Sequence, residues 1–255
     1  MGWMKYINGN YARSLLGNKF PLELKRVVAT LDQFLNFLND NGDPLPMQLL
    51  MHNLSKQRKR ELSEFAKVDA DIVLQHDPLT GRLTADLRDY RIHREFARPE
   101  AEHRVVLHIL ITDAWKTTWA VHLPLQSLML GFGDPRDGFQ CYAHGISFMN
   151  TDGHPTQEEL FYCGITSRSW LTRMNEHFRD IKNNSKKLFH KRWREYQDDQ
   201  HVLLNSELVA LNHTKDGAMG WEEWIVDRCM EADKSLNMIP GGRKGWGNRV
   251  KTRVD

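Results

Sequence analysis

The stretch FYCGITSRSWLTRMNEH, residues 161–177, decides how the second half of this chain is organised. Its first six residues are mostly aromatic or β-branched, which is typical of a short strand. Ser169 then precedes the apolar Trp170, and a serine before an apolar run is a usual helix start. The stretch therefore predicts a strand that leads directly into a helix, with Arg173 and His177 one turn apart on the same face.

The composition is that of an ordinary globular protein. The 255 residues are 40% hydrophobic and 27% charged, which argues against wholesale disorder. The 35 lysines and arginines nearly balance the 33 aspartates and glutamates, and the formal charge is +2. Only local clusters of charge can therefore argue for a nucleic-acid partner.

The cysteines and the apolar runs bear on the compartment. The 3 cysteines are odd in number and show no CxxC spacing, which argues against a zinc site or a disulfide framework and fits a reducing compartment. The N-terminus has no continuous apolar core, and no apolar run is long enough to span a membrane. We expect a cytoplasmic protein without a membrane segment.

The N-terminal half predicts a small α+β module. Residues 21–39 place apolar side chains on one helical face, and residues 46–67 predict a second helix with a basic, solvated middle. Residues 71–90 predict a hairpin, and residues 103–123 predict a second, buried hairpin that turns around Asp113.

Four histidines near these hairpins raise the question of a metal site. They are His93, His103, His108 and His122. Two of them lie in the middle of a predicted strand, and none has a partner at a ligand spacing such as HxxxH. We interpret them as hydrogen-bonded core or edge residues.

A Gly- and Pro-rich junction, GFGDPRDG at residues 131–138, separates the two halves. We place the domain boundary near residue 135, between a module of unknown role (1–135) and a second domain with a basic tail (136–255). The second domain predicts strands over 139–149, 159–166 and 201–212, two helices on either side of a break at 183–185, and a last helix over 221–232.

Several motifs of the second domain occur together in a known order. Tyr162 opens the run YCGIT, Arg173 and His177 follow, Glu222 lies on a later helix, and Asn237 precedes the run PGG. In this order and spacing they resemble the GIY-YIG nuclease superfamily, over roughly residues 139–245. The resemblance implies an α+β fold in which a small, mainly antiparallel three-stranded sheet is flanked by helices and preceded by the N-terminal module.

The resemblance also implies roles for single residues. Arg173 faces the scissile phosphate, Glu222 binds Mg²⁺ or Mn²⁺, and Gly164 gives the backbone room. Tyr162 takes the tyrosine position of the second motif. His177, or a tyrosine hydroxyl, moves the proton of the attacking water.

Two assignments stay open between neighbours. The GIY triplet of the first motif is absent, because Ser147 stands where its tyrosine is expected. Tyr142, five residues earlier on the same strand, is the other candidate for that catalytic position. On the last helix either Glu222 or Glu223 is the metal ligand, since helical phase lets only one of them face the site.

Basic residues around these motifs predict contacts to DNA phosphates. The candidates for nucleic-acid binding are Lys182, Lys186, Lys187, Lys191, Arg192, Asn237, Arg243 and Lys244. A solvated helix face explains the basic run between residues 182 and 194 equally well.

The residue types suit one reaction. Phosphodiester hydrolysis develops negative charge on the phosphoryl oxygens, which an arginine fork and a divalent cation stabilise. We therefore expect a metal-dependent endonuclease that hydrolyses DNA phosphodiester bonds. The alternative is a catalytically weak or inactive module of the same fold that binds nucleic acid or a protein partner.

Overall fold

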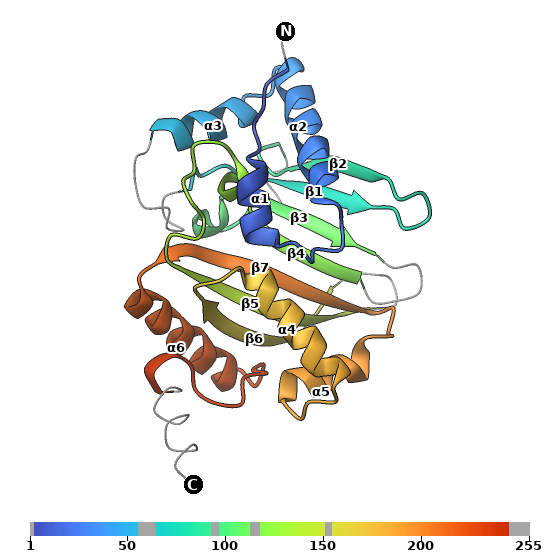
Figure 1. The fold of residues 1–255 in the computed structure, drawn as a ribbon, viewed down its shortest axis with the longest axis vertical. Coiled ribbons are helices and arrows are strands. Elements are labelled where there is room, and N and C mark those ends of the chain that lie inside the picture. Colours follow the sequence, from blue (N-terminus) through green and yellow to red (C-terminus); the bar gives the residue numbers. More distant parts are fainter. Residues whose placement is uncertain (1–2, 56–64, 93–96, 113–117, 151–154, 245–255) are drawn as a thin grey trace.

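A computed structural model describes residues 3–55, 65–92, 97–112, 118–150 and 155–244, which form an α+β fold (Figure 1). The helices are α1 (Gly9–Leu16), α2 (Leu24–Asp40), α3 (Leu45–Ser55), α4 (Trp170–Lys182), α5 (Leu188–Tyr196) and α6 (Lys215–Glu231). The strands are β1 (Ala70–His76), β2 (Leu83–Asp89), β3 (Val106–Ile111), β4 (Thr118–Pro124), β5 (Phe139–Met149), β6 (Pro155–Thr166) and β7 (Val202–His213). No helix in these ranges is long and apolar enough to cross a membrane.

All these strands join one mixed sheet of 7 strands in the order β2-β1-β3-β4-β7-β5-β6. The predicted three-stranded sheet is therefore wrong. β5 pairs antiparallel with β6 and β7, as expected, but the other edge of β7 pairs in parallel with β4, from Thr118 beside Leu203 to His122 beside Glu207. The alternation of side chains along β7 indicates which residues face the core, and it does not show how many strands lie beside it.

The hydrophobic core also runs through both halves. Leu74 and Leu107 from the first half belong to the same buried cluster as Trp170 and Leu204 from the second. The sheet crosses the proposed division near residue 135 through the pairing of β4 with β7. The division into residues 1–135 and 136–255 stays a prediction.

Most elements of the N-terminal half are confirmed. α2 matches the helix predicted over 21–39, and both hairpins form, as β1–β2 and β3–β4. The helix predicted over 46–67 is wrong at its end, because Lys67 lies in an isolated bridge with Arg104. The basic middle of that helix and the turn at Asp113 lie outside the described residues.

α1 is a helix that the sequence analysis did not predict. Its start is capped by the side chain of Asn8, whose Oδ1 accepts a hydrogen bond from the Asn10 N–H at 2.9 Å. The segment before it is held by α2, where Asp32 accepts hydrogen bonds from the N–H groups of Tyr6 and Ile7, each at 2.9 Å. Tertiary hydrogen bonds thus fix a segment with a weak local helix signal.

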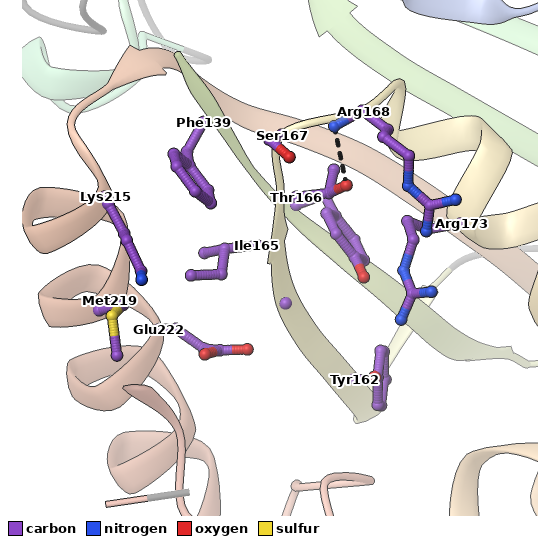
Figure 2. A pocket seen from close by; sticks show the side chains of 12 residues that line it. Phe139, Tyr162, Ile165, Thr166, Ser167, Arg168, Arg173, Lys215, Met219 and Glu222 are labelled. Carbon is purple, nitrogen blue, oxygen red and sulfur yellow. Dashed lines mark hydrogen bonds between the residues drawn. The ribbon is translucent and has the colours of Figure 1, made fainter. Parts of the chain in front are cut away.

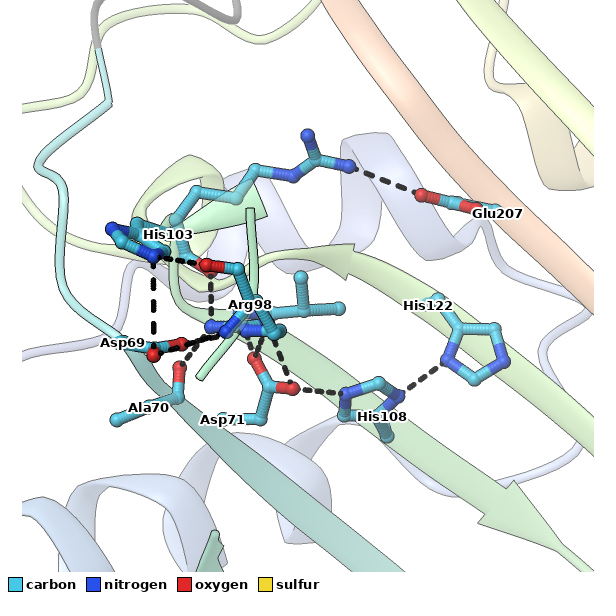
Figure 3. A network of polar contacts seen from close by, with 10 residues as sticks. Asp69, Ala70, Asp71, Arg98, His103, His108, His122 and Glu207 are labelled. Atoms are coloured by element: carbon cyan, nitrogen blue, oxygen red, sulfur yellow. Dashed lines mark hydrogen bonds and ion pairs between the residues drawn. The ribbon is translucent and has the colours of Figure 1, made fainter. Parts of the chain in front are cut away.

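A polar network lies across the N-terminal strands (Figure 3). Arg98 forms ion pairs with Asp69 at 2.8 Å and with Asp71 at 2.9 Å. Asp71 also bonds to His108 Nε2 at 3.0 Å, and His108 Nδ1 lies 2.6 Å from His122 Nδ1. The interpretation of His108 and His122 as hydrogen-bonded residues is confirmed.

The same network continues into the second half of the sheet. His122 Nε2 bonds to Asn205 Oδ1 at 3.1 Å, Asn205 Nδ2 donates to Ser147 Oγ at 2.6 Å, and Ser147 Oγ donates to Glu159 at 3.1 Å. Together with Asp71 and His108, these residues supply one polar group from each of β1, β3, β4, β7, β5 and β6. Hydrogen bonds therefore link the strands of both halves.

α4 and α6 cover opposite faces at the β6 end of the sheet. Neighbouring residues of a strand point to opposite faces, and Tyr142 belongs to the main core with Trp170 of α4. Cys141, next to it, packs instead with Ala210 and with Ala218 of α6. The two helices therefore stand on either side of the edge strand β6.

Candidate active site

A cavity of about 260 Å³, the β6 cavity, lies over the edge strand between α4 and α6 (Figure 2). It brings together the predicted site residues Tyr142, Tyr162, Gly164, Arg173 and Glu222. These residues come from β5, β6, α4 and α6, so the fold assembles them from four separate elements.

Gly164 is required by the tyrosine beside it. Tyr142 on β5 pairs with Gly164 on β6. A Cβ atom at Gly164 would lie 2.6 Å from the Tyr142 hydroxyl oxygen, which is closer than van der Waals contact allows. The glycine of the run YCGIT therefore leaves space for a phenol ring.

Of the two candidates for the first-motif position, only Tyr142 lines the β6 cavity, and Ser147 does not. The Tyr142 ring is 1% exposed, whereas Ser147 is hydrogen-bonded to Asn205 and Glu159. Burial raises the pKa of Tyr142, the nearby Tyr162 adds to the rise, and the charge and hydrogen bond of Arg173 oppose it. The Tyr142 hydroxyl is therefore neutral at physiological pH.

Arg173 is a cation of the β6 cavity that interacts with Tyr142. Burial opposes its charge, but Tyr142 and Glu176 outweigh burial and raise the pKa of Arg173. Glu176 forms ion pairs with Arg173 and, at 2.9 Å, with Arg168. One carboxylate thus holds two guanidinium groups beside the cavity, and the Arg173 side chain keeps 34% of its surface exposed.

Glu222 is held in the cavity by the glycines of the PGG run. Its Oε2 accepts a hydrogen bond from the Gly242 N–H at 3.0 Å. A Cβ atom at Gly241 would lie 2.3 Å from the Glu222 carbonyl oxygen, and Gly242 has a φ of +56°. Only glycines let this segment approach α6 so closely.

Between the two candidate glutamates, the geometry favours Glu222. Glu222 lines the β6 cavity, while Glu223 forms an ion pair with Lys244 at 3.1 Å. α6 begins at Lys215, where Thr214 caps the N–H of Gly217 at 3.1 Å. The helix start predicted at residue 221 is therefore wrong, and Glu222 lies in the middle of the helix.

Glu222 is also the residue that could hold a metal ion. It is the only carboxylate among the described residues that line the β6 cavity. No group of three His, Cys, Asp or Glu side chains in the described ranges could bind an ion by itself. One carboxylate completed by water and substrate oxygens fits the way proteins bind Mg²⁺.

His177 lies away from the β6 cavity, although it follows Arg173 by one turn. Its ring is 5% exposed and stands edge-on to Tyr162, with the ring centroids 4.8 Å apart. His177 Nδ1 bonds to His190 Nε2 at 2.8 Å. Burial, then the charges of His190 and Arg173, lower the pKa of His177 to about 3, so it is a weak base at neutral pH.

Asn237 is a structural clamp. Its side-chain amide accepts a hydrogen bond from the Cys163 N–H at 2.9 Å and donates to the Cys163 carbonyl at 2.8 Å. The neighbouring Leu236 N–H donates to Phe161 at 2.6 Å. The segment after α6 is thereby fixed to the free edge of β6, and both polar atoms of the Asn237 amide are used.

The predicted phosphate-binding residues divide into two groups. Lys182, Lys186 and Lys191 are exposed and have no ion-pair partner among the described residues. The remaining basic ones each have a carboxylate partner: Lys187 with Asp180, Arg192 with Glu195, Arg243 with Asp216, and Lys244 with Glu223 and Asp227.

Two further cations line the β6 cavity that the sequence motifs did not predict, namely Arg168 and Lys215. Lys215 directly follows the capping residue Thr214, and a threonine before a polar first turn is a recognisable helix start. Gly217 and Gly220 weaken the helical signal of this segment, which explains why the start was placed too late.

Comparisons with protein-family models, with curated proteins and with solved structures found no match. The resemblance to GIY-YIG nucleases therefore rests on the residues and on their arrangement in this chain.

Proposed function

We propose that this chain is a metal-dependent endonuclease of the GIY-YIG type that hydrolyses DNA phosphodiester bonds. The observation that carries the proposal is the meeting of Tyr142, Arg173 and Glu222 at one cavity over an edge strand. An arginine fork, a carboxylate and phenol hydroxyls at one open site suit phosphodiester hydrolysis.

Arg173 binds the scissile phosphate in this proposal. Its guanidinium group can donate two parallel hydrogen bonds to phosphoryl oxygens, where charge develops in the transition state. Glu176 keeps the guanidinium oriented before substrate binds. Arg168 and Lys215, which border the same cavity, attract the flanking phosphates.

Glu222 would hold Mg²⁺ or Mn²⁺, which would supply charge stabilisation for the phosphoryl group and acidify bound water. The hydrogen bond from the Gly242 N–H fixes one oxygen of the carboxylate. Replacing Gly241 or Gly242 by a larger residue would therefore disturb the orientation of Glu222 without changing the Glu222 side chain.

The tyrosines position the attacking water. Because burial raises the pKa of Tyr142, we assign to it a hydrogen bond that orients the water and no full negative charge. Tyr162, which borders the same cavity, can hold the attacking water by a second hydrogen bond, and the proton of that water passes to bulk solvent, since a neutral phenol cannot accept it and His177 is a weak base outside this cavity.

The rival function is a non-cutting module that binds nucleic acid or a protein. The observation that favours it is the ion pair between Arg173 and Glu176, because a phosphate must compete with this carboxylate for the arginine. The proposed partner of the endonuclease is DNA. A cytoplasmic location is supported by the free cysteines Cys141, Cys163 and Cys229.

Incubation of supercoiled plasmid DNA with the protein and Mg²⁺ or Mn²⁺ tests the proposal, with EDTA as the metal-free control. We expect the wild type and Glu223→Ala to cut and Glu222→Ala not to cut. Salt-sensitive binding without any cutting would support the rival module. Equal cutting by Glu222→Ala would remove Glu222 from the mechanism.

A further inference from the structure

A second cavity, of about 460 Å³, adjoins the first and is called the α5 cavity here. Tyr162, Arg173 and Glu222 line both cavities. The remaining wall comes from α4, from α5 and from the segment that Asn237 clamps to β6. A ligand that touches Arg173 in the first cavity can therefore extend into the second without leaving the protein surface.

The size of the α5 cavity distinguishes it from its neighbour. Pockets for small organic ligands usually hold about 300–1,000 Å³. The α5 cavity lies within that range, whereas the β6 cavity is smaller and suits a phosphate with its waters.

The walls of the α5 cavity suit a flat ring. Tyr162 and Phe189 line the cavity and stack on each other, with ring centroids 5.3 Å apart and planes inclined by 18°. Phe189 is buried, so the half-buried Tyr162 is the ring that a ligand can reach. Leu236, Met238, Ile239 and Pro240 complete an apolar side. Aromatic and apolar walls of this kind favour stacking and burial of planar groups.

The polar atoms of the α5 cavity suit a heterocycle better than a hydrocarbon. His177 and His190 line the cavity and bond to each other, and His190 is 0% exposed. His177 Nε2 and His190 Nδ1 are buried and have no hydrogen-bond partner among the described residues. Buried polar atoms without partners are uncommon and costly, and a ring with donors and acceptors along its edge can satisfy them.

We propose that the α5 cavity binds the base of the nucleotide whose phosphate lies at Arg173. The inference rests on the proposed function, because it places a DNA phosphate in the β6 cavity. A base within a duplex is stacked and paired, so the ligand is a single-stranded or extruded nucleotide. This gives the proposed nuclease a substrate class: DNA with an unpaired nucleotide beside the cleaved bond.

Calorimetric titration with 2′-deoxyadenosine 5′-monophosphate and with 2-deoxyribose 5-phosphate tests the inference. The two probes share a sugar phosphate and differ in the base. Stacking of one base predicts that the nucleotide binds the wild type at least about tenfold more tightly. Equal affinities would overturn the inference, because the protein would then bind the phosphate alone.

Variants locate the base. Phe189→Leu keeps an apolar side chain in the core and removes the ring, and Met238→Ala shortens an exposed side chain of the cavity. Both substitutions are expected to reduce severalfold the advantage of the nucleotide, which is the factor by which it binds more tightly than the sugar phosphate. Met230→Ala, an exposed methionine that lines neither cavity, is the matched control and should keep it. An unchanged advantage in Phe189→Leu and Met238→Ala would contradict the inference, since the base would bind elsewhere.

The plasmid assay separates this inference from the proposed function. Tighter binding of the nucleotide without DNA cutting would support the base cavity and overturn the nuclease. Cutting without any preference for the nucleotide would support the nuclease and overturn the base cavity.

Discussion

Two histidine clusters in this chain share a short contact between imidazole rings and differ in everything around it. His108 and His122, the sheet pair, have both ring nitrogens hydrogen-bonded, with Asp71 and Asn205 at the outer positions. The aromatic cluster of His144, His177 and His190 leaves one nitrogen of each ring buried and without a partner among the described residues.

The directions of the hydrogen bonds around the sheet pair fix which ring nitrogens must carry a hydrogen. Ser147 donates to Glu159 and accepts from Asn205 Nδ2, so Asn205 Oδ1 faces His122 as an acceptor. Both outer Nε2 atoms of the sheet pair must therefore donate, and the contact between the two Nδ1 atoms needs a further hydrogen. Burial, and then the neighbouring His108, lower the pKa of His122 to about 4.

The difference indicates where stability and function reside. A fully bonded polar network rigidifies a fold, and the sheet pair links the strands of both halves. Unpartnered buried nitrogens weaken the folded state, and perturbed groups of this kind gather at functional sites. His177 and His190 of the aromatic cluster line the α5 cavity, whereas the sheet pair lines neither cavity.

The largest expected effect is a loss of folding stability when the hydrogen bonds around the sheet pair are removed. Asp71→Ala removes the partner of Arg98, His108 and the Val106 N–H. Leaving these buried donors without an acceptor should lower the free energy of unfolding by about 3–5 kcal/mol. Urea denaturation measures it, with the exposed Asp86→Ala on β2 as control, expected within about 0.5 kcal/mol of the wild type. A loss in Asp71→Ala no larger than in the control would contradict the structural role.

The pH dependence of stability tests the aromatic cluster. Folded His177 has a pKa of about 3, below its ordinary value of about 6.5. The unfolded chain therefore binds more protons between these values, and stability is present above pH 6.5 and lost as the pH falls. His177 alone should lower the free energy of unfolding by about 1–2 kcal/mol between pH 6.5 and pH 5.

Denaturation series at several pH values check this for His177→Phe, which should show a shallower loss of stability. His201→Gln, at an exposed position after α5, should keep the slope of the wild type. If His177→Phe and the wild type had the same slope, the buried neutral state of His177 would be refuted.

The contact between Gly164 and Tyr142 predicts an intermediate effect. Gly164→Ala places a methyl group 2.6 Å from the Tyr142 hydroxyl oxygen, and overpacking of this kind costs about 1–3 kcal/mol. DNA cutting should fall as well, because Tyr142 must move. Gly220→Ala on α6 meets nothing within 4 Å and should be neutral or slightly stabilising. Full activity of Gly164→Ala would show that the position of Tyr142 does not matter.

The smallest effect concerns the basic residues of α5. Lys191 has no ion-pair partner among the described residues, and its neighbour Arg192 is paired with Glu195 at 2.8 Å. If Lys191 contacts a phosphate, Lys191→Ala should reduce the slope of log affinity against log salt by about 0.9. Arg192→Ala should change the slope less. The reverse order would assign the phosphate contact to Arg192.

Local patterns predicted most elements and several site residues. The hairpins and the strand and helix around YCGIT follow from short-range spacing, whereas the grouping of Arg173 with Tyr162 and Gly164 is what the resemblance implied. The parallel pairing of β4 with β7 does not, because it joins segments far apart in the sequence through backbone hydrogen bonds that leave no side-chain pattern. The predicted size of the sheet was therefore wrong, while the predicted strands are present in the structure.

Five of the predicted site residues line the β6 cavity, whereas their catalytic roles stay predictions. The choice of Tyr142 over Ser147 depends on strand register, which the run GIS does not reveal. The sequence predicted that Asn237 binds nucleic acid, and in the structure its side chain is hydrogen-bonded to the backbone of Cys163. The burial of His177 depends on α5 packing over α4, which the sequence of α4 alone cannot show.

The most direct test compares the same substitution in two arginines, Arg173→Gln at the β6 cavity and Arg98→Gln in the sheet network. We predict that Arg173→Gln cuts plasmid DNA at least about 100-fold more slowly and unfolds at nearly the same urea concentration as the wild type. Arg98→Gln should lose about 3 kcal/mol of stability while its folded fraction cuts at the rate of the wild type. Wild-type cutting by Arg173→Gln, or loss of cutting in fully folded Arg98→Gln, would contradict the assignment of catalysis to the β6 cavity.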